Sequence, residues 1–296
     1  MLKRRTVLVL GAGASAPFGF PTGAKLSQMV WGIRGNGIGL RLLKDLGYSD
    51  REIDDFCNQF YFSGRGSIDA FLEHRPDLLE IGKHFIAILV GAFEQEVSLF
   101  SFERNWLRYV YGNLNAKFDE FEQNQLSFIT YNYDRSVEHF LFTAFQQGYK
   151  AAERECEELA KKIPVIHLHG SLGNLSWQKG KTPRLYVAPT DGVEVRAAAR
   201  EIKIIHEDIT DGRDADFDYA KRLLKAAERI VIMGFGYDKT NMERLGMNAS
   251  INCDMIGSCV GMSNREKEVA DARSQTRLAL VEGDCFDIVR EHIQWE

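Results

Sequence analysis

The sequence predicts an α/β fold with a doubly wound, Rossmann-like parallel sheet and a helical insertion. Short apolar runs predict the strands, at 6–10, 126–130, 163–167, 202–206, 229–233 and 277–281. The runs are continuous and do not alternate with polar residues, which is typical of strands buried on both faces of a parallel sheet. Helical periodicity at 151–162, 216–228 and 263–275, the last with Ser263 or Asn264 as N-cap, completes the alternation of strand and helix.

One region interrupts this alternation. Residues 27–117 contain helical patterns and no convincing strand, and the longest helical stretch is 77–97. We therefore expect a single domain over 1–296, with a helical insertion at 27–117 between its first two strands. Glycine-rich segments at 34–39 and 62–67 are either hinges of this insertion or surface connections, which is the commoner role.

Composition limits the class of protein. The chain has 296 residues, of which 45% are hydrophobic and 27% charged, as is usual for a globular enzyme. Its net charge of −5 excludes an overall basic field, so we expect no direct nucleic-acid binding. The five scattered cysteines favour a cytoplasmic location, and no pair has the C-x2-C spacing of a zinc ribbon. No apolar run approaches the ~20 residues of a membrane helix, so no membrane association is expected.

The opening segment allows a secretion signal as one interpretation. Lys3, Arg4 and Arg5 resemble a positive n-region, and Ala14-Ser15-Ala16 resembles a cleavage site. The strongly apolar stretch covers only 7–10 and is followed by glycines, whereas a signal needs about 7–15 apolar residues. We therefore favour a strand that leads into a glycine turn.

That turn, GAGASA at 11–16, has the G-x-G-x-x-G/A pattern directly after a predicted strand. Glycines there let backbone N–H groups approach a pyrophosphate, and the N-terminus of the following helix favours negative charge. The first acidic residue is Asp45, and the charged residues before it are all basic: Lys3, Arg4, Arg5, Lys25, Arg34, Arg41 and Lys44. We expect these charges to favour an anionic ligand; the alternative is that some of them only solvate a surface.

An ordinary dehydrogenase is not expected. No Asp or Glu follows the turn at about 20 residues, where such an enzyme binds the ribose hydroxyls. Pro17 and Pro21 also interrupt the helix that should continue from the turn. The turn therefore indicates a dinucleotide bound for chemistry other than hydride transfer.

Further motifs lie at or just after predicted strands, where doubly wound sheets bind ligands. They are ITYNYD (129–134), HLHGSLG (167–173), MGFGYDKTN (233–241) and SNREKE…LALVEGDCFDIV (263–289). Together with the opening turn, and in this order, they resemble the sirtuin (SIR2) superfamily. More closely, the set resembles the SIR2-like domain of bacterial antiphage NAD-consuming proteins, as does SIDAFL (67–72). The motifs extend over almost the whole chain.

The resemblance implies an NAD site, with NAD+ as the substrate. It assigns the pyrophosphate to Gly11, Ala12, Gly13, Ala14 and Ser15, and the nicotinamide side to Phe20 and Pro21. The nicotinamide ribose and its pocket are assigned to Asn132 and Asp134, and the ribose and phosphates to Gly234 and Phe235. The adenosine end is assigned to Asn264, Asp284, Cys285 and Phe286. The resemblance also makes Asn132 and His169 the catalytic residues.

These residue types suit cleavage of the nicotinamide–ribose bond. Positive charge builds on the ribose as nicotinamide leaves, so the barrier falls when that charge is stabilised and a nucleophile is positioned. The amide of Asn132 can orient the ribose hydroxyls and a water molecule. His169 can accept a proton near neutral pH, and this chemistry needs no metal.

Some of these residues also have structural interpretations. Asn132 and Asp134 can form a turn that caps a helix at 135–147. GFG at 234–236 can be an exit from a strand, and Asn241 can contact a ligand or cap a helix.

His167 and His169 share one side of a strand, and we assign His167 to a buried, hydrogen-bonded structural role. A two-histidine metal site lacks an evident third ligand. Cys285 is expected to be a small buried residue and not a nucleophile.

The chain departs from a sirtuin deacylase at two places. No cysteine lies between Cys156 and Cys253, so the zinc module that follows the His-Gly motif of deacylases is missing and no zinc is expected. Thr130-Tyr131 stands where deacylases have Thr-Gln. These departures favour hydrolysis of NAD over deacylation of a protein.

We therefore expect a cytoplasmic NAD+ glycohydrolase (NADase) that releases nicotinamide and ADP-ribose or a cyclic product. The resemblance implies an antiphage defense effector, restrained by homo-oligomerisation or by a co-encoded ATPase or nuclease partner. One alternative is an NAD-dependent deacylase or ADP-ribosyltransferase, which requires an acceptor. The other is a subunit that senses NAD or ADP-ribose without turnover.

Overall fold

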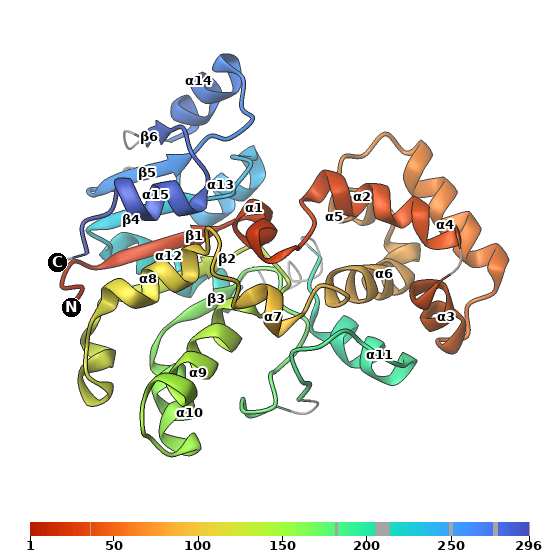
Figure 1. The fold of residues 1–296 in the computed structure, drawn as a ribbon. Helices are drawn as coiled ribbons and strands as arrows, with labels where there is room; N and C mark the ends of the chain where they lie inside the picture. Colours follow the sequence, from red (N-terminus) through yellow and green to blue (C-terminus); the bar gives the residue numbers. More distant parts are fainter. Residues whose placement is uncertain (36, 181–182, 205–213, 249–250, 275–277, 296) are drawn as a thin grey trace.

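The computed structural model describes residues 1–35, 37–180, 183–204, 214–248, 251–274 and 278–295, and within them a six-stranded sheet forms the centre (Figure 1). Its strands are β1 (Thr6–Leu10), β2 (Leu126–Thr130), β3 (Val165–His167), β4 (Arg229–Met233), β5 (Asp254–Ser258) and β6 (Leu278–Val281). Their order is β3-β2-β1-β4-β5-β6, and every neighbouring pair is parallel. This is the doubly wound, Rossmann-like order, so the predicted fold class is confirmed.

The central strand β1 shows why the strands appear as continuous apolar runs. Thr6 pairs with Leu126 on one side and with Arg229 on the other, and all five residues of β1 are buried. Side chains alternate between the two faces of a strand. Leu8 and Leu10 therefore join one hydrophobic cluster, while Val7 and Val9 join the other.

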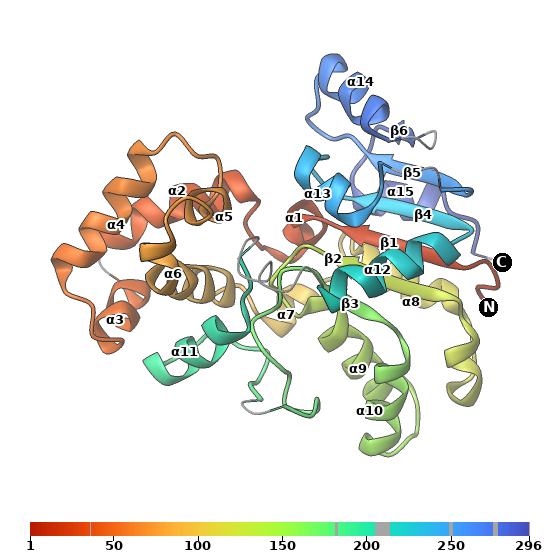
Figure 2. The same cartoon turned by 180° about the vertical axis from the view of Figure 1, so that it is seen from behind.

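Helices cover both faces of this sheet. The cluster of Leu8 includes residues of α8 (Trp106–Leu114), α9 (Ser136–Gly148) and α15 (Cys285–Glu291). The cluster of Val7 includes residues of α12 (Ala215–Ala226), α13 (Lys239–Leu245) and α14 (Asn264–Arg273). The two opposite views show α8 and α15 on one face and α12 on the other (Figures 1 and 2).

A group of helices lies beyond the carboxyl end of β1 (Figure 1). It comprises α2 (Gly23–Gly32), α3 (Ile38–Asp45), α4 (Asp50–Phe62), α5 (Ile68–Leu72), α6 (Leu79–Gly91) and α11 (Gly192–Glu201), which packs on α6. We call these six helices the helical lobe. The chain then returns to the sheet through α7 (Glu96–Leu99) and α8, where Trp106 Nε1 donates a hydrogen bond of 2.7 Å to the carbonyl of Ala14.

The remaining helices are short or peripheral. They are α1 (Ala12–Ser15), α10 (Glu153–Lys162), and the 3-10 turns η1 (Ala16–Phe18), η2 (Ile33–Gly35), η3 (Pro76–Leu78) and η4 (Phe118–Gln123). None of the helices in the described ranges is long and apolar enough to cross a membrane.

The helix starts follow from local sequence. Ser263 caps α14, with its hydroxyl accepting from the N–H of Glu266 and the Glu266 side chain bonding back to Ser263. This capping box confirms Ser263, and not Asn264, as the N-cap. The helical stretch predicted at 77–97 is divided in two, because α6 ends at Gly91 and α7 begins at Glu96.

One predicted strand is wrong and one strand was not predicted. At 202–206, Ile202 makes a single bridge to Gly170 and no named strand includes Lys203 or Ile204, while 205–206 lie outside the described residues. The unpredicted strand is β5, whose sequence DMIGS has one β-branched residue and a glycine. That glycine, Gly257, is needed for packing, because a Cβ there would lie 2.1 Å from the Tyr237 hydroxyl oxygen.

The turns after β1 and β4 pack backbone to backbone. Gly11 N–H donates to Met233 O and Gly13 N–H donates to Gly234 O, both at 2.9 Å. A Cβ on Gly13 would lie 2.7 Å from the Cα of Gly234. Gly234 has a φ of +61°, and its Cβ would lie 2.1 Å from the backbone nitrogen of Ala14. The glycines of the two motifs are therefore required for the contact between the turns.

A comparison of two glycines tests this packing. Gly234→Ala should lower the free energy of unfolding by roughly 2–4 kcal/mol, since it adds a positive-φ strain of about 1–2 kcal/mol to a collision with backbone. Gly236→Ala is the matched control, because nothing lies within 4 Å of its Cβ position. Urea denaturation of both variants measures the difference, and equal losses would contradict the packing argument.

Candidate functional site

A cavity of about 940 Å³ lies between the carboxyl edge of the sheet and the helical lobe. From the sheet side it is lined by Gly11, Ala12, Gly13, Tyr131, Asn132, Tyr133, His169, Gly234, Phe235, Ser258, Asp284 and Cys285, among others. From the lobe side it is lined by Thr22, Gly23, Ser67, Asp69, Ala70 and Glu73. It lies beside β1 and β4, the point where doubly wound sheets bind ligands.

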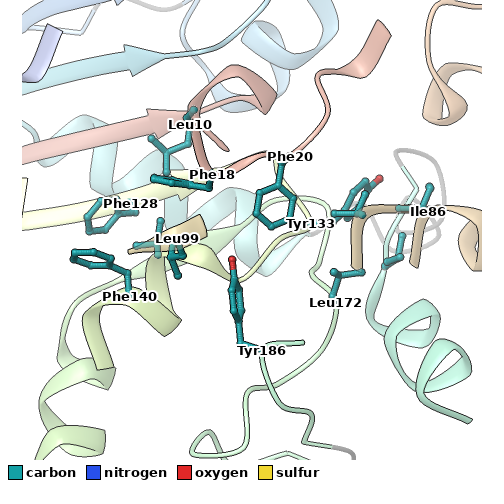
Figure 3. Packing of buried hydrophobic residues seen from close by; sticks show 14 of the residues in the cluster. Leu10, Phe18, Phe20, Ile86, Leu99, Phe128, Tyr133, Phe140, Leu172 and Tyr186 are labelled. Atoms are coloured by element: carbon teal, nitrogen blue, oxygen red, sulfur yellow. The ribbon is translucent and has the colours of Figure 1, made fainter. Parts of the chain in front are cut away.

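The structure places the residues predicted from sequence in two groups. Gly11, Ala12, Gly13, Asn132, His169, Gly234, Phe235, Asp284 and Cys285 line the cavity, whereas Ala14, Ser15, Phe20, Pro21, Asp134, Asn264 and Phe286 are not among its lining residues. Phe20 is buried in the hydrophobic cluster that also contains Tyr133 and Tyr186 (Figure 3). Asn264 is exposed in the first turn of α14, and Phe286 packs on Tyr109 with ring centroids 5.5 Å apart.

Asn132 is held by the glycine turn. Its side-chain Nδ2 donates to Gly11 O and to Ser15 Oγ, both at 2.9 Å. These two bonds use both amide hydrogens and fix which way the carboxamide faces. No described residue donates to Oδ1, so this oxygen remains as a hydrogen-bond acceptor on a residue that lines the cavity.

Asp134 supports this arrangement from behind. Its Oδ2 accepts 2.7 Å from the Ser15 hydroxyl, and its Oδ1 accepts from the hydroxyl and the N–H of Ser136. Burial raises the pKa of this carboxyl, and the hydrogen bonds from Ser136 and Ser15 partly oppose the rise. Asp134 therefore orients Asn132 through Ser15. It also accepts from the N–H of Ser136 at the start of α9, but the N-cap of that helix is Arg135 and not Asp134.

His169 lines the cavity and is only 7% exposed. Its ring centroid lies 5.5 Å from that of Tyr131. Burial lowers the pKa of His169 to about 4, with a further contribution from the positive charge of Arg244, while Asn241 acts in the opposite direction. His169 is therefore a neutral imidazole at physiological pH, able to accept a proton.

The glycine after this histidine is required by the fold. Gly170 has a φ of +66°, and a Cβ there would lie 1.9 Å from the carbonyl oxygen of Glu201. The carbonyl of His169 also accepts 2.9 Å from the N–H of Lys203. The His-Gly motif thus fixes the histidine backbone against the segment after α11.

His167 has the structural role predicted for it. Its Nδ1 bonds the Asn132 carbonyl at 2.8 Å and its Nε2 bonds Glu138 Oε1 at 2.7 Å. Both partners are acceptors, which favours the imidazolium with two N–H donors. Burial alone would lower the pKa of His167, but the Glu138 carboxylate and the hydrogen bonds reverse this and raise it. Glu138 accordingly has a lowered pKa despite its burial.

The interaction between His167 and Glu138 should make the stability of the fold depend on pH. Because the folded pKa of His167 is raised, its pairing stabilises the fold fully below the unfolded value of about 6.5, and the contribution is lost as pH rises through the folded pKa. Glu138→Gln should therefore lower the free energy of unfolding by about 3 kcal/mol near pH ~6 and by progressively less at alkaline pH.

Denaturant unfolding from pH ~6 to ~9 measures this difference. The exposed variant Glu291→Gln is the control and should stay within about 0.5 kcal/mol of the wild type throughout. A loss for Glu138→Gln that grows with pH would contradict the assignment.

The expected positive field around the site is wrong. Among the described residues that line the cavity none is Lys or Arg. The N-terminal basic residues are used elsewhere: Arg4 pairs with Asp254, Arg5 with Glu228 and Lys44 with Asp50, Arg34 stacks on Trp31, and Arg41 donates to Thr190 O. These basic residues are close in sequence but do not gather at the cavity, because the chain enters the helical lobe soon after the glycine turn.

Carboxylates line the cavity instead, at Asp69, Glu73, Asp238 and Asp284. Asp284 caps α15 and pairs with Arg104 at 2.8 Å, and Asp238 caps α13 by accepting from the N–H of Asn241. Asn241 is also among the residues that line the cavity. Cys285 is buried, and burial raises the pKa of its thiol to about 12, as suits a residue that is not a nucleophile.

Several lining residues were not predicted. Tyr131 donates to Asn241 O at 2.8 Å and packs 4.9 Å from the ring of Phe235, and Ser258 Oγ accepts from Gly234 N–H at 2.8 Å. Tyr131 appeared only as a departure from deacylases. Ser258 belongs to the strand that was not predicted. Asp69 lies within SIDAFL, a motif noticed in the sequence without any residue being assigned a role.

No protein family model matches this chain, and no curated protein matches it. Among solved structures it is similar to a SIR2 homolog–NAD complex, with 16% identity and a TM-score of 0.45 over 97% of this chain and 86% of the other. It is also similar to SIR2 in complex with the inhibitor EX-527, 2'-O-acetyl-ADP-ribose and a deacetylated p53 peptide, with 15% identity, a TM-score of 0.44 and coverage of 97% and 91%. A third is Sir2Tm bound to a propionylated peptide, with 15% identity, a TM-score of 0.43 and the same coverage.

These comparisons describe a similarity of chain arrangement at low identity. The class of the protein rests on its own geometry: a doubly wound α/β sheet with a ligand-sized cavity at its switch point. The cavity lining includes Asn132, oriented by the glycine turn, and the buried His169.

Proposed function

We propose that the chain is an NAD+ glycohydrolase. It would convert NAD+ and water to nicotinamide, ADP-ribose and a proton, or close the ribose on another group of the same molecule to give a cyclic product. The observation that carries the proposal is that Asn132 and His169 line one cavity together with both glycine turns. At about 940 Å³ that cavity is near the upper end of the roughly 300–1,000 Å³ usual for ligand sites, as a dinucleotide requires.

The charges of the cavity suit this reaction. Positive charge develops on the ribose as the nicotinamide bond breaks, and preorganised negative or dipolar groups stabilise such a centre. The described lining has carboxylates and no Lys or Arg, and the positive charge of Arg244 acts on His169 from outside the lining. A pyrophosphate would then depend on neutral donors, such as the N–H of Ala12 at the first position of α1.

Asn132 and His169 have different roles in the proposed reaction. The free Oδ1 of Asn132 can accept a hydrogen bond from a ribose hydroxyl or from the attacking water. His169, being neutral, can take the proton that the nucleophile loses as it attacks. Tyr131 and Phe235 form an apolar wall that limits access of other water molecules.

The biological role in the proposal is that of an antiphage defense effector that depletes NAD in the cytoplasm. It is supported by the ordered motifs in the sequence and by the absence of a cysteine-pair zinc module from them. Homo-oligomerisation, or a co-encoded ATPase or nuclease, would provide the control that such an activity needs.

Turnover of NAD+ by the purified chain tests the proposal. We expect nicotinamide and ADP-ribose, or its cyclic form, to appear on chromatography without any acyl-peptide. Asn132→Ala and His169→Ala should each lower kcat/KM at least about 100-fold, the usual minimum for loss of a positioned acid–base group. The exposed His292→Ala is the control and should retain wild-type activity.

Other outcomes point to the alternatives. Nicotinamide release only in the presence of an acyl-peptide or acceptor protein would indicate a deacylase or transferase. Binding of NAD+ without any turnover, including in the presence of the co-encoded neighbour, would indicate a sensing subunit.

The pH profile makes a separate prediction. With the pKa of His169 at about 4, the base stays neutral well below the ordinary histidine value of 6.5. We therefore expect kcat/KM to fall on the acid side only as pH approaches about 4. Initial rates from pH ~4 to ~8 measure this profile, and a midpoint near pH ~6.5 would contradict the proposed state of His169.

A further inference from the structure

We propose that Asp69 is a substrate-binding residue supplied by the helical lobe, whose carboxyl group accepts the N–H of the nicotinamide carboxamide. This inference rests on the proposed function and adds to it a residue that determines which pyridine ring the site accepts. Asp69 lies in α5, on the side of the cavity that faces the glycine turns and Asn132.

Local structure fixes the position of Asp69. The Ser67 hydroxyl caps α5 by accepting 3.2 Å from the N–H of Ala70, so Asp69 lies in the first turn of a capped helix. Ser67, Asp69, Ala70 and Glu73 all line the cavity, so α5 faces it from its N-cap to its C-cap.

A hydrogen bond joins Asp69 to the chain segment that carries the proposed catalytic asparagine. The Tyr133 hydroxyl donates to Asp69 Oδ1, and Tyr133 directly follows Asn132 in the chain. Tyr133 is itself buried at the junction between the sheet and the lobe (Figure 3). The contact therefore ties the Asp69 carboxyl group to the segment of Asn132, which the proposed function assigns to the nicotinamide ribose.

Most other carboxylates near the cavity are already engaged. Both oxygens of Asp134 accept from serine groups behind the turn, and Asp134 does not line the cavity. Asp284 pairs with Arg104 and caps a helix, and Asp238 caps α13. Among the described residues, only Tyr133 donates a side-chain hydrogen bond to Asp69, which leaves capacity to accept another.

The chemistry of a carboxyl group matches a primary amide. A carboxyl oxygen accepts the amide N–H in either protonation state. Burial raises the pKa of Asp69, with Tyr133 partly opposing the rise, and a protonated carboxyl can also donate to the amide carbonyl. Asp69 would then hold the carboxamide N–H while the ring departs as neutral nicotinamide, with no covalent bond to Asp69.

An NAD+ analogue separates this role from a structural one. In 3-acetylpyridine adenine dinucleotide a methyl group replaces the amide NH2, so the carbonyl remains and the N–H donors are lost. The measurement is the ratio of kcat/KM for NAD+ to kcat/KM for the analogue. Asp69→Ala should lower that ratio at least about tenfold relative to the wild type, the effect of losing one hydrogen bond to a polar or charged partner. General damage to the fold lowers both rates and leaves the ratio unchanged.

Three further variants complete the experiment. Asp69→Asn keeps an acceptor oxygen and should retain more of the ratio than Asp69→Ala. Tyr133→Phe removes the donor that orients the carboxyl and should lower the ratio by an intermediate factor. Asp54→Ala, exposed on α4 of the same lobe, is the matched control and should leave it unchanged.

The outcomes distinguish this inference from the proposed function. A wild-type chain that cleaves NAD+ and an Asp69→Ala variant with an unchanged ratio would overturn the assignment of Asp69 alone. A wild-type chain that cleaves neither dinucleotide, alone or with the co-encoded neighbour, contradicts the glycohydrolase. The ratio of the dissociation constants for NAD+ and the analogue, measured by calorimetry for wild type and Asp69→Ala, then decides the role of Asp69 by the same tenfold criterion. A chain that binds neither dinucleotide overturns both proposals.

Discussion

The contact between two glycine turns is the constraint on which the rest of the structure depends. At the centre of the sheet, the turn after β1 and the turn after β4 approach so closely that Gly13 and Gly234 have no room for side chains. Their backbone hydrogen bonds join the two halves of the sheet where the direction of winding changes. The cavity opens over this contact, so the same glycines determine both the packing of the fold and the floor of the site.

A buried polar network extends from these turns to Asn132. Asp134 holds Ser15, Ser15 and Gly11 hold the amide of Asn132, and His167 holds the Asn132 carbonyl with support from Glu138. Removing one member leaves another buried group unsatisfied, which is costlier than the loss of one exposed bond. The network uses both amide hydrogens of Asn132 and fixes the orientation of its carboxamide.

The helical lobe gives the cavity its second wall and its acidic character. Tertiary packing brings α5 over the carboxyl edge of the sheet, so that Asp69 reaches Tyr133 although 64 residues separate them in the chain. The N-terminal basic residues are directed to ion pairs and stacking contacts outside the cavity. The described lining therefore carries carboxylates and no Lys or Arg.

Local sequence determined the parts of this protein that follow from short-range physics. Continuous β-branched runs identified β1, β2 and β4, capping residues identified the start of α14, and glycine spacing identified the turns. Strand β5 was not predicted because its glycine is required by packing against Tyr237, which lies far away in the chain. Of the strand expected at 202–206, the described residues include only an isolated bridge at Ile202. Only the tertiary structure decided which of these residues line the cavity. Asp69 does, whereas Asp134 and the N-terminal basic residues do not. Those outcomes depend on burial and on contacts between segments far apart in the chain, which no local pattern of residues encodes.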